Sequence, residues 1–281
     1  MTTLAELLRR APEAANLSDR PEQELRILAG AATGWNPTAF YTAPERCLNT
    51  AQLHRFEGLW NRRLQGEPIA YLLGEQGFWS LLLEVTPDTL VPRPETERLV
   101  ELALELLPAG HCRVADLGTG SGAIALALAT ERPAWQLVAT DRSEPALKVA
   151  ARNRDRHRLS QVELRHGDWC TALGIGRFDA VLSNPPYVAP QDPHLGGPGV
   201  CFEPRSALVA GNDGMADLAA LIDQSPVHLN PGGWLLLEHG CQQAAQVRTG
   251  LSARGFVGVC THQDLAGQDR VTLGRWPGGR P

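Results

Sequence analysis

Apolar positions in the first quarter of the chain recur at helical spacing. From Leu4 to about Gln65 they form short periodic stretches that are separated by proline, glycine and asparagine. The clearest predicted helix runs from Pro44 to Gln65, and Gly66 supplies its stop. One apolar stripe follows this helix and consists of Leu53, Phe56, Trp60 and Leu64. We expect a small helical bundle with this stripe in its core.

The pattern changes between Phe78 and Val91, where strand-like residues are interrupted by Pro87-Asp88. Such an interrupted stretch predicts a β-hairpin. Pro94 and the acidic residue after it then begin a helix with one apolar face, formed by Leu99, Leu102 and Leu106. The prediction is therefore a helical domain over residues 1–75, a linking β-hairpin over 76–93 and a larger domain over 94–281.

In the larger domain, apolar runs typical of strands alternate with helical segments. The runs are Arg113–Leu117, Leu137–Thr140, Val162–Arg165, Phe178–Ser183 and Trp234–Glu238, and the helices include Ala123–Thr130 and Pro145–Asn153. Such alternation indicates an α/β fold, in which helices cover a mostly parallel sheet. Right-handed crossovers place the carboxyl ends of its parallel strands at one edge, where ligands bind in such folds.

Composition narrows the classes of function. Of the 281 residues, 43% are hydrophobic and 20% are charged, which is ordinary for a globular chain. A net charge of -5 argues against a uniformly basic surface, so no stable nucleic-acid partner is expected. The six cysteines lack zinc-site spacing, which predicts no metal and mostly buried, reduced thiols. Neither a signal peptide nor a membrane-length apolar run is visible, so we expect a cytoplasmic protein without a membrane partner.

A glycine-rich loop follows the first predicted strand of the larger domain. It consists of Asp116, Leu117, Gly118, Thr119, Gly120, Ser121 and Gly122. Glycines permit a sharp turn and close approach of a ligand, and the following helix presents free N–H groups, so a nucleotide-type ligand is expected. Asp141, after the second strand, is placed to bind ribose hydroxyls in either NAD or S-adenosylmethionine. Asp116 and Gly122 favour S-adenosylmethionine, while a dinucleotide and a plain turn without a ligand remain alternatives.

The tetrapeptide Asn184, Pro185, Pro186 and Tyr187 follows the fourth strand, at the ligand-binding edge. An amide or an adenine amine is a planar nitrogen with two hydrogens. The Asn184 side-chain oxygen and the Pro185 carbonyl are suited to accept one hydrogen each. This arrangement orients the nitrogen and stabilises positive charge as a methyl group is transferred, and Tyr187 is expected to pack on the flat face of the substrate. A tight turn without chemistry is the alternative.

Two residues after the third strand are candidates for holding adenine. The Asp168 carboxylate is expected to face the exocyclic amine and the Trp169 indole to face the ring, although an indole that only fills the core is an equal alternative. Methyl transfer from a sulfonium needs no nucleophilic side chain, so the lack of a Ser/His/Asp or Cys/His arrangement is no objection.

Several further motifs accompany the loop and the tetrapeptide. They are Gly66–Tyr71, Val91–Glu97, Phe202–Pro204, Leu235–Gly240 and Arg270–Gly274. Together these segments resemble the bacterial glutamine-N5 methyltransferases that modify peptide chain release factors, the HemK family. The resemblance extends over nearly the whole chain and departs from the family pattern at Gly77 and Cys201, which affects expectations about docking only.

The resemblance implies a seven-stranded Rossmann-like class I methyltransferase domain whose last strand is antiparallel, together with a helical amino-terminal domain that helps to dock the substrate. It implies S-adenosylmethionine as cofactor, S-adenosylhomocysteine as product, and the glutamine of the Gly-Gly-Gln loop of class 1 peptide chain release factors as substrate. Gly118 to Gly122, Asp141 and Trp169 would contact the cofactor, and Asn184 to Tyr187 the glutamine.

Three other functions are weighed against this one. Adenine-N6 DNA methyltransferases use a similar tetrapeptide, but they must flip a base and hold the duplex, which the acidic charge balance disfavours. Ribosomal-protein glutamine methyltransferases are nearer relatives and harder to exclude. A noncatalytic module that docks release factors is disfavoured because the glycine loop and the tetrapeptide are both intact.

Overall fold

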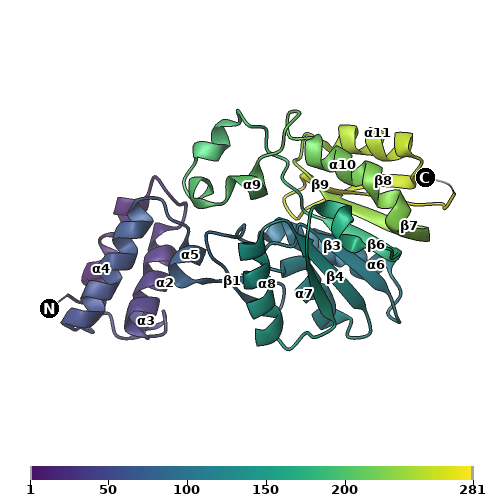
Figure 1. Cartoon of the computed structure of the whole chain (residues 1–281). Coiled ribbons are helices and arrows are strands. Elements are labelled where there is room, and N and C mark those ends of the chain that lie inside the picture. Colours follow the sequence, from purple (N-terminus) through teal and green to yellow (C-terminus); the bar gives the residue numbers. More distant parts are fainter. Residues whose placement is uncertain (1, 280–281) are drawn as a thin grey trace. The chain divides into compact units, whose positions relative to one another are not determined.

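The structure is a computed structural model that describes residues 2–279, and it contains two compact units. The smaller unit comprises the chain up to Glu75 together with Pro193–Phe202, and the larger unit comprises Gln76–Asp192 and the chain from Glu203 onward. In Figure 1 the smaller unit contains the purple and dark-blue helices, and the larger unit contains the main sheet. Each unit is described by itself below.

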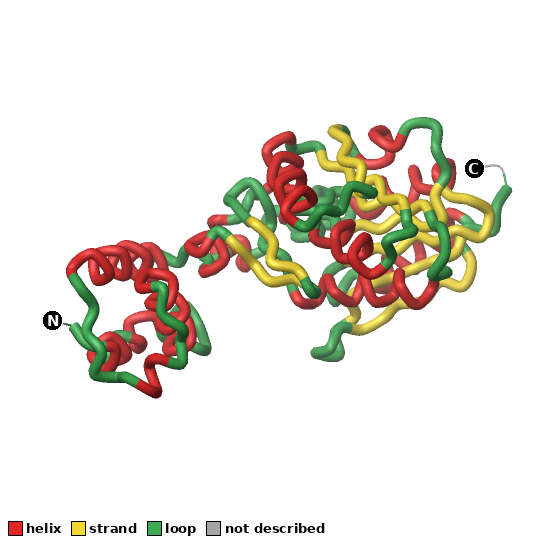
Figure 2. The backbone as a smooth tube through the Cα atoms, turned by 90° about the horizontal axis from the view of Figure 1, so that it is seen from below, coloured by secondary structure: helices red, strands yellow, loops and turns green. Residues whose placement is uncertain are grey.

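The smaller unit is helical, as predicted. Figure 2 shows helices and loops in its amino-terminal part, and two short 3-10 turns lie in its second segment. Its helices are α1 (Leu4–Leu8), η1 (Ala11–Ala14), α2 (Pro21–Thr33), α3 (Ala39–Thr42), α4 (Thr50–Leu64) and α5 (Ile69–Leu73), and its 3-10 turns include η4 (Pro193–Gly196) and η5 (Val200–Phe202). Phe56 and Trp60 are fully buried between these helices, which confirms that the predicted stripe faces the core.

Helix α4 begins later than the predicted residue Pro44. The side chain of Asn49 accepts a hydrogen bond from the Gln52 backbone N–H, and the Gln52 side chain accepts one from the Asn49 N–H. This capping box satisfies N–H groups that the first turn leaves free, and it ends the non-helical segment at Asn49.

The predicted hairpin is present, but its turn lies elsewhere. Strands β1 (Glu75–Phe78) and β2 (Leu81–Glu84) pair, and Trp79 lies in the turn with a φ of 56°. Pro87-Asp88 was expected to interrupt the hairpin; instead it belongs to a separate turn, closed by the Thr89 N–H on the Thr86 carbonyl at 3.0 Å. The error arose because Trp79 occupies a left-handed turn conformation that a tryptophan rarely adopts.

The larger unit contains the seven-stranded sheet that was expected. Its strand order is β5-β4-β3-β6-β7-β9-β8, in which β3 to β7 pair in parallel and β9 is antiparallel to both β7 and β8. The strands are β3 (Arg113–Leu117), β4 (Gln136–Asp141), β5 (Val162–His166), β6 (Phe178–Ser183), β7 (Leu229–Glu238), β8 (Val257–Gln263) and β9 (Asp269–Arg275). The antiparallel last strand is therefore confirmed.

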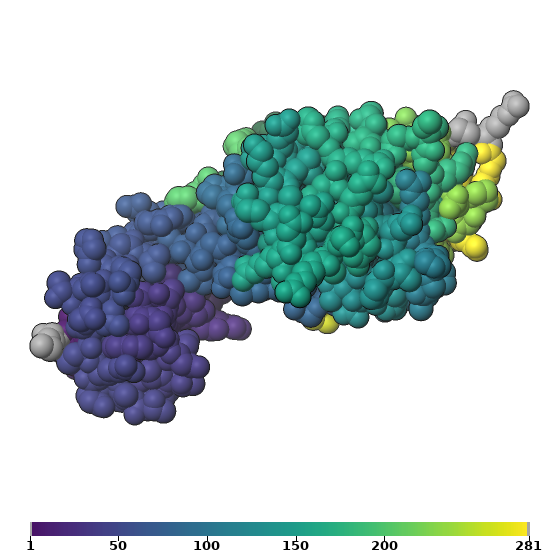
Figure 3. Space-filling view, turned by 60° about the horizontal axis from the view of Figure 1, so that its bottom comes forward, coloured from purple at the N-terminus to yellow at the C-terminus, as the bar shows by residue number. Residues whose placement is uncertain are grey.

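Helices cover both faces of this sheet. Neighbouring strand residues alternate between two cores, so that Val114 packs with α6 and α7 while Ala115 packs with α10 and α11. In Figure 1, α10 and α11 lie beside β8 and β9, and in Figure 3 the teal middle of the sequence covers most of the visible face of this unit. The helices are η2 (Pro94–Thr96), α6 (Glu97–Leu106), α7 (Ala123–Glu131), α8 (Glu144–Arg156), η3 (Trp169–Leu173), α9 (Arg205–Leu208), α10 (Ala216–Gln224), η6 (Ser225–His228) and α11 (Ala244–Arg254).

The state of the cysteines differs in part from the expectation. The six cysteines are free, but four of them are exposed, so the prediction of mostly buried thiols is wrong; the exposed ones are Cys47, Cys201, Cys241 and Cys260. Within residues 2–279, no helix is long and apolar enough to cross a membrane.

Candidate active site

A pocket opens at the carboxyl ends of the parallel strands of the larger unit. Its empty volume, including the open mouth, is about 930 Å³. Most of the predicted site residues line it, and they lie at or just after the carboxyl ends of four strands, β3, β4, β5 and β6. They are Gly118, Thr119, Gly120, Ser121, Asp141, Asp168, Trp169, Asn184 and Pro186. Asp116, Gly122, Pro185 and Tyr187 are outside this lining and lie behind or beside it.

The glycine loop is held by the end of the neighbouring strand β4. The N–H groups of Gly118 and Thr119 both donate to the Thr140 carbonyl at 2.9 Å. Gly118 and Gly120 have φ values of 73° and 57°, so both positions require the left-handed conformation that glycine adopts without strain. Gly122 caps α7 with a φ of 89°. The sequence therefore has glycine where the turn demands it.

Asp141 shapes the loop as well as the pocket. Its Oδ2 accepts the Gly120 N–H at 2.9 Å, and its Oδ1 accepts the Ser143 N–H at 2.8 Å. Burial raises the pKa of this carboxyl, and the two N–H donors oppose the rise. A carboxylate oxygen can accept more than one hydrogen bond, so the side chain can serve the loop and still accept from a ligand hydroxyl.

Asp116 lies fully buried beneath the loop. Its Oδ2 accepts the Thr119 hydroxyl at 2.6 Å and the Ala125 N–H at 3.2 Å, whereas its Oδ1 has no hydrogen-bond partner within residues 2–279. Burial raises the pKa of Asp116 to about 6, against these two donors. A buried carboxyl with a free oxygen is suited to positive charge and unsuited to a phosphate.

The Trp169 indole packs against the glycine loop. A Cβ at Gly118 would lie 3.1 Å from Trp169 Cζ3, so the ring approaches the backbone where a side chain is missing. The indole N–H donates to Asp217 and thereby opposes the effect of burial, which raises the pKa of that carboxyl. Trp169 has a φ of 42° and lines the pocket although it is mostly buried. Trp169 therefore packs in the core and also forms part of the pocket lining.

The tetrapeptide divides between the pocket and its surroundings. Asn184 and Pro186 line the pocket, and Asn184 Nδ2 donates to the Thr96 hydroxyl oxygen at 3.1 Å. The Tyr187 ring packs at the edge of the core with α10 and α11, and its carbonyl accepts from Gln243 Nε2 at 3.0 Å. Contact of the Tyr187 ring with a substrate stays a prediction.

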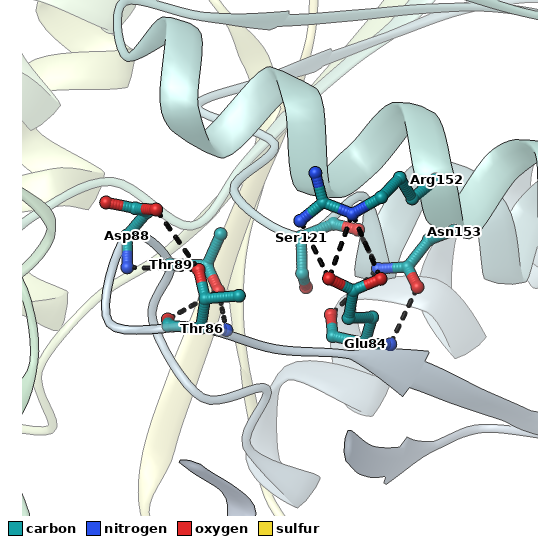
Figure 4. Close-up of polar contacts among 7 residues, drawn as sticks. All are labelled: Glu84, Thr86, Asp88, Thr89, Ser121, Arg152 and Asn153. Carbon is teal, nitrogen blue, oxygen red and sulfur yellow. Dashed lines mark hydrogen bonds and ion pairs between the residues drawn. The ribbon is translucent and has the colours of Figure 1, made fainter. Parts of the chain in front are cut away.

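One wall of the pocket follows strand β2, and Asn153 of α8 fixes where it begins (Figure 4). Asn153 Oδ1 accepts the Glu84 N–H at 2.7 Å, and Nδ2 donates to the carbonyls of Glu84 and Ser121, both at 2.9 Å. Arg152 holds the Glu84 carboxylate with both Nε and a terminal nitrogen. Figure 4 shows these contacts beside the turn of Thr86, Asp88 and Thr89, and Asp88 and Thr89 line the pocket. The buried side-chain amide of Asn153 therefore holds both the glycine loop and this wall.

The wall is fixed again further along the chain. The buried Glu203 carboxylate accepts the Val91 N–H at 3.1 Å and pairs with Arg93. Arg142 donates to the carbonyl of Ser206, a residue of α9, at 3.0 Å. Several other residues of the pocket lining were not predicted from the sequence, although some of them lie in the Val91–Glu97 and Phe202–Pro204 motifs. The unpredicted residues are Leu90, Pro92, Arg93, Thr96, Pro204, Ser206 and Ala207.

Comparison with known proteins shows the family. The chain is 51% identical over 278 residues to the release factor glutamine methyltransferase of Pseudomonas aeruginosa, covering 98% of this chain and 99% of that protein. This chain belongs to the release factor glutamine methyltransferase family. It is also 49% identical over 259 residues to the enzyme of the same name from Salmonella typhimurium, covering 92% of this chain and 94% of the relative.

Two domain families match separate parts of the chain. The PrmC N-terminal domain matches residues 6–74, and the methyltransferase small domain matches residues 98–196. A methyltransferase from Pyrococcus furiosus has the same fold, with a TM-score of 0.55, 23% identity, and coverage of 79% of this chain and 99% of that one. The predicted family and the α/β fold of a class I methyltransferase are thereby confirmed.

Proposed function

We propose that this protein transfers the methyl group of S-adenosylmethionine to the side-chain amide nitrogen of the glutamine in the Gly-Gly-Gln loop of class 1 peptide chain release factors. The observation that carries the proposal is that Asn184 and the glycine loop line one pocket in a chain of this family. The names of the relatives support the choice of release factors over other acceptors. The helical domain over residues 1–75 would then contribute to docking.

The carboxyl groups in and beneath the pocket fit S-adenosylmethionine better than a dinucleotide. Asp116 offers a buried, unpartnered carboxyl oxygen directly under the loop, where the pyrophosphate of a dinucleotide would be repelled. Gly118 to Gly122, Asp116 and Asp141 would hold the amino-acid and ribose parts of the cofactor, and Asp168 and Trp169 the adenine. When bound, the cofactor supplies an electrophilic methyl group on a sulfonium and a neutral thioether as leaving group.

The residues of the chain act on the substrate nitrogen. Asn184 Oδ1 and the Pro185 carbonyl accept its two hydrogens, which fixes the plane of the amide and turns the face of the nitrogen toward the methyl group. The same two oxygens stabilise positive charge that develops on nitrogen, because they carry partial negative charge and are already in place. Pro185 and Pro186 have no N–H to compete for these oxygens and stiffen the backbone. Tyr187 would cover the flat face of the glutamine amide.

A labelling experiment with three acceptors tests the proposal. The purified protein is incubated with methyl-labelled S-adenosylmethionine and, in separate reactions, a class 1 release factor, ribosomal proteins and duplex DNA. We expect label on the release factor, and mass spectrometry should place it on the glutamine of the Gly-Gly-Gln loop. Label on ribosomal protein or DNA alone would overturn the proposed substrate.

The role of Asn184 has its own test. Asn184→Ala removes the acceptor oxygen and should lower kcat by about 100-fold, the usual loss when one preorganised charge-stabilising group is removed. Gln246→Ala, at an exposed amide side chain of α11 outside the proposed docking domain and the pocket, is the control and should leave kcat unchanged. Near-normal kcat in the Asn184 variant would contradict the role.

A further inference from the structure

Behind the tetrapeptide lies a buried glutamate that the proposed mechanism does not yet use. Glu238 ends strand β7, and Asn184 follows strand β6, its neighbour in the sheet. The last residues paired between these strands are Ser183 and Leu237, so Asn184 and Glu238 follow at corresponding positions. The Glu238 side chain is almost completely buried, and its Oε2 has no hydrogen-bond partner within the described chain.

Thr96 lies between these two residues. Its hydroxyl oxygen accepts the Asn184 Nδ2 hydrogen at 3.1 Å, and its hydroxyl group also hydrogen-bonds with Glu238. Tyr187 donates its phenolic hydrogen to Glu238 Oε1 across 3.5 Å. Two members of the glutamine-binding tetrapeptide therefore contact the Glu238 carboxylate, Asn184 through Thr96 and Tyr187 directly.

The Glu238 carboxylate determines which group donates and which accepts in each of these hydrogen bonds. Above about pH 7, where the Glu238 carboxyl is ionised, it only accepts, so the single hydroxyl hydrogen of Thr96 points to Glu238. The Thr96 oxygen can then only accept from Asn184, which requires the amide nitrogen of Asn184 to face Thr96. The Asn184 oxygen Oδ1 is thereby turned away from Thr96 and has no donor among the described residues. A flipped amide would present N–H groups to the substrate nitrogen, where an acceptor is needed.

We propose that Glu238 and Thr96 are positioning residues that set the orientation of the Asn184 amide for methyl transfer. The inference rests on the proposed function, because it presumes that Asn184 Oδ1 accepts a hydrogen from the substrate. Packing alone does not account for Glu238, since a buried carboxylate with an unpartnered oxygen costs stability that an apolar side chain would not.

Two further charged groups act on Glu238. Arg270 on the adjacent strand β9 attracts its negative charge, and Glu95 beside Thr96 repels it. Arg270 is itself bound to Asp264 at 3.1 Å and to the His239 carbonyl at 3.3 Å, so its contact with Glu238 is not exclusive. The directing role falls to Glu238, which is the acceptor that Thr96 and Tyr187 share.

The test compares Thr96→Val, Thr96→Ser, Glu238→Gln and the double variant Thr96→Val/Glu238→Gln in the release-factor labelling assay. Thr96→Val should lower kcat by about 10- to 100-fold, as misplacement of a reacting group does, with a much smaller change in KM. Thr96→Ser keeps the hydroxyl and should recover most of the loss. Glu238→Gln should also lower kcat, and the double variant should be little worse than Thr96→Val because both changes act through one set of bonds. Glu105→Gln, at an exposed glutamate of α6, is the charge control.

The outcomes separate this inference from the proposed function. If the wild-type protein labels the glutamine and Thr96→Val does so with an unchanged kcat, the positioning role is wrong and the proposed function stands. Additive losses in the double variant would also overturn it, since independent sites give additive effects. If the wild-type protein labels no glutamine while labelling another acceptor, the proposed function and the positioning role are both wrong.

Discussion

Replacing Asn153 tests whether one buried amide supports both the glycine loop and the pocket wall. Asn153→Ala removes three hydrogen bonds, with the Glu84 N–H, the Glu84 carbonyl and the Ser121 carbonyl. Each hydrogen bond contributes about 1 kcal/mol to the free energy of unfolding, and the higher helix propensity of alanine offsets about 0.5 kcal/mol of the loss. The free energy of unfolding should therefore fall by about 2.5 kcal/mol. For a unit of this size that corresponds to a fall in Tm of roughly 5–10 °C.

Thermal unfolding followed by circular dichroism measures the stability loss, and calorimetry with S-adenosylmethionine measures its effect on the loop. The affinity should fall as well, because the Ser121 carbonyl is no longer held. Asn153→Asp keeps the acceptor for the Glu84 N–H but places negative charge next to two carbonyls, so it should be at least as unstable as the alanine variant. Asn61→Ala, at an exposed helical asparagine of α4, is the control. A Tm and an affinity of Asn153→Ala that match this control would refute the reasoning.

Three further predictions follow from the site. Asp141→Ala should weaken S-adenosylmethionine binding by about 1.5–3 kcal/mol, the range for hydrogen bonds to a charged group, and unchanged affinity in calorimetry would contradict the cofactor role. Gly118→Ala should cost about 1–2 kcal/mol in thermal unfolding, because its φ is 73° and its Cβ would meet Trp169 at 3.1 Å, whereas Gly110→Ala has open space and should be neutral. Burial raises the pKa of Glu238 from its ordinary 4.5 to about 7. Between pH 4.5 and about 7 the folded chain therefore binds more protons than the unfolded chain, and the free energy of unfolding falls as the pH rises through this range. Glu238→Gln should therefore be more stable than the wild type at pH 8, by about 3 kcal/mol, and equal to it near pH 4; a lower Tm at pH 8 would show that the buried charge is not the cost we infer.

The strands of the larger unit were predictable where local sequence features mark their ends. Strands β3 and β6 match the prediction at both ends, since each is a mostly apolar run that ends within two residues of a glycine or a proline. The start of β7 was missed because Asn230, Pro231, Gly232 and Gly233 are typical of a turn, yet they lie within a strand that begins at Leu229. Tertiary pairing with β6 and β9 outweighs their local preference.

The site was predictable where its residues are consecutive or lie at the end of a predicted strand, as Asp141 does. The glycine loop and the tetrapeptide carry their chemistry in one short segment each, and both reach the pocket. Thr96, Glu203 and Glu238 belong to motifs that were noticed, but their partners are distant in sequence, so no local pattern indicates that they are buried. Asn153 has no signal of its own, because an asparagine late in a helix is ordinarily read as an exposed residue near its end.

The wall between Glu84 and Val91 is bound at both ends by side chains of the protein itself, Asn153 and Glu203. Ordering a flexible segment when a ligand binds costs conformational entropy, which is subtracted from the affinity. Because the wall between Glu84 and Val91 is already fixed in the folded protein, most of its conformational entropy is lost during folding and not during ligand binding. The pocket is thus preorganised along this side, and the binding energy of the cofactor remains available for aligning its methyl group with the substrate nitrogen.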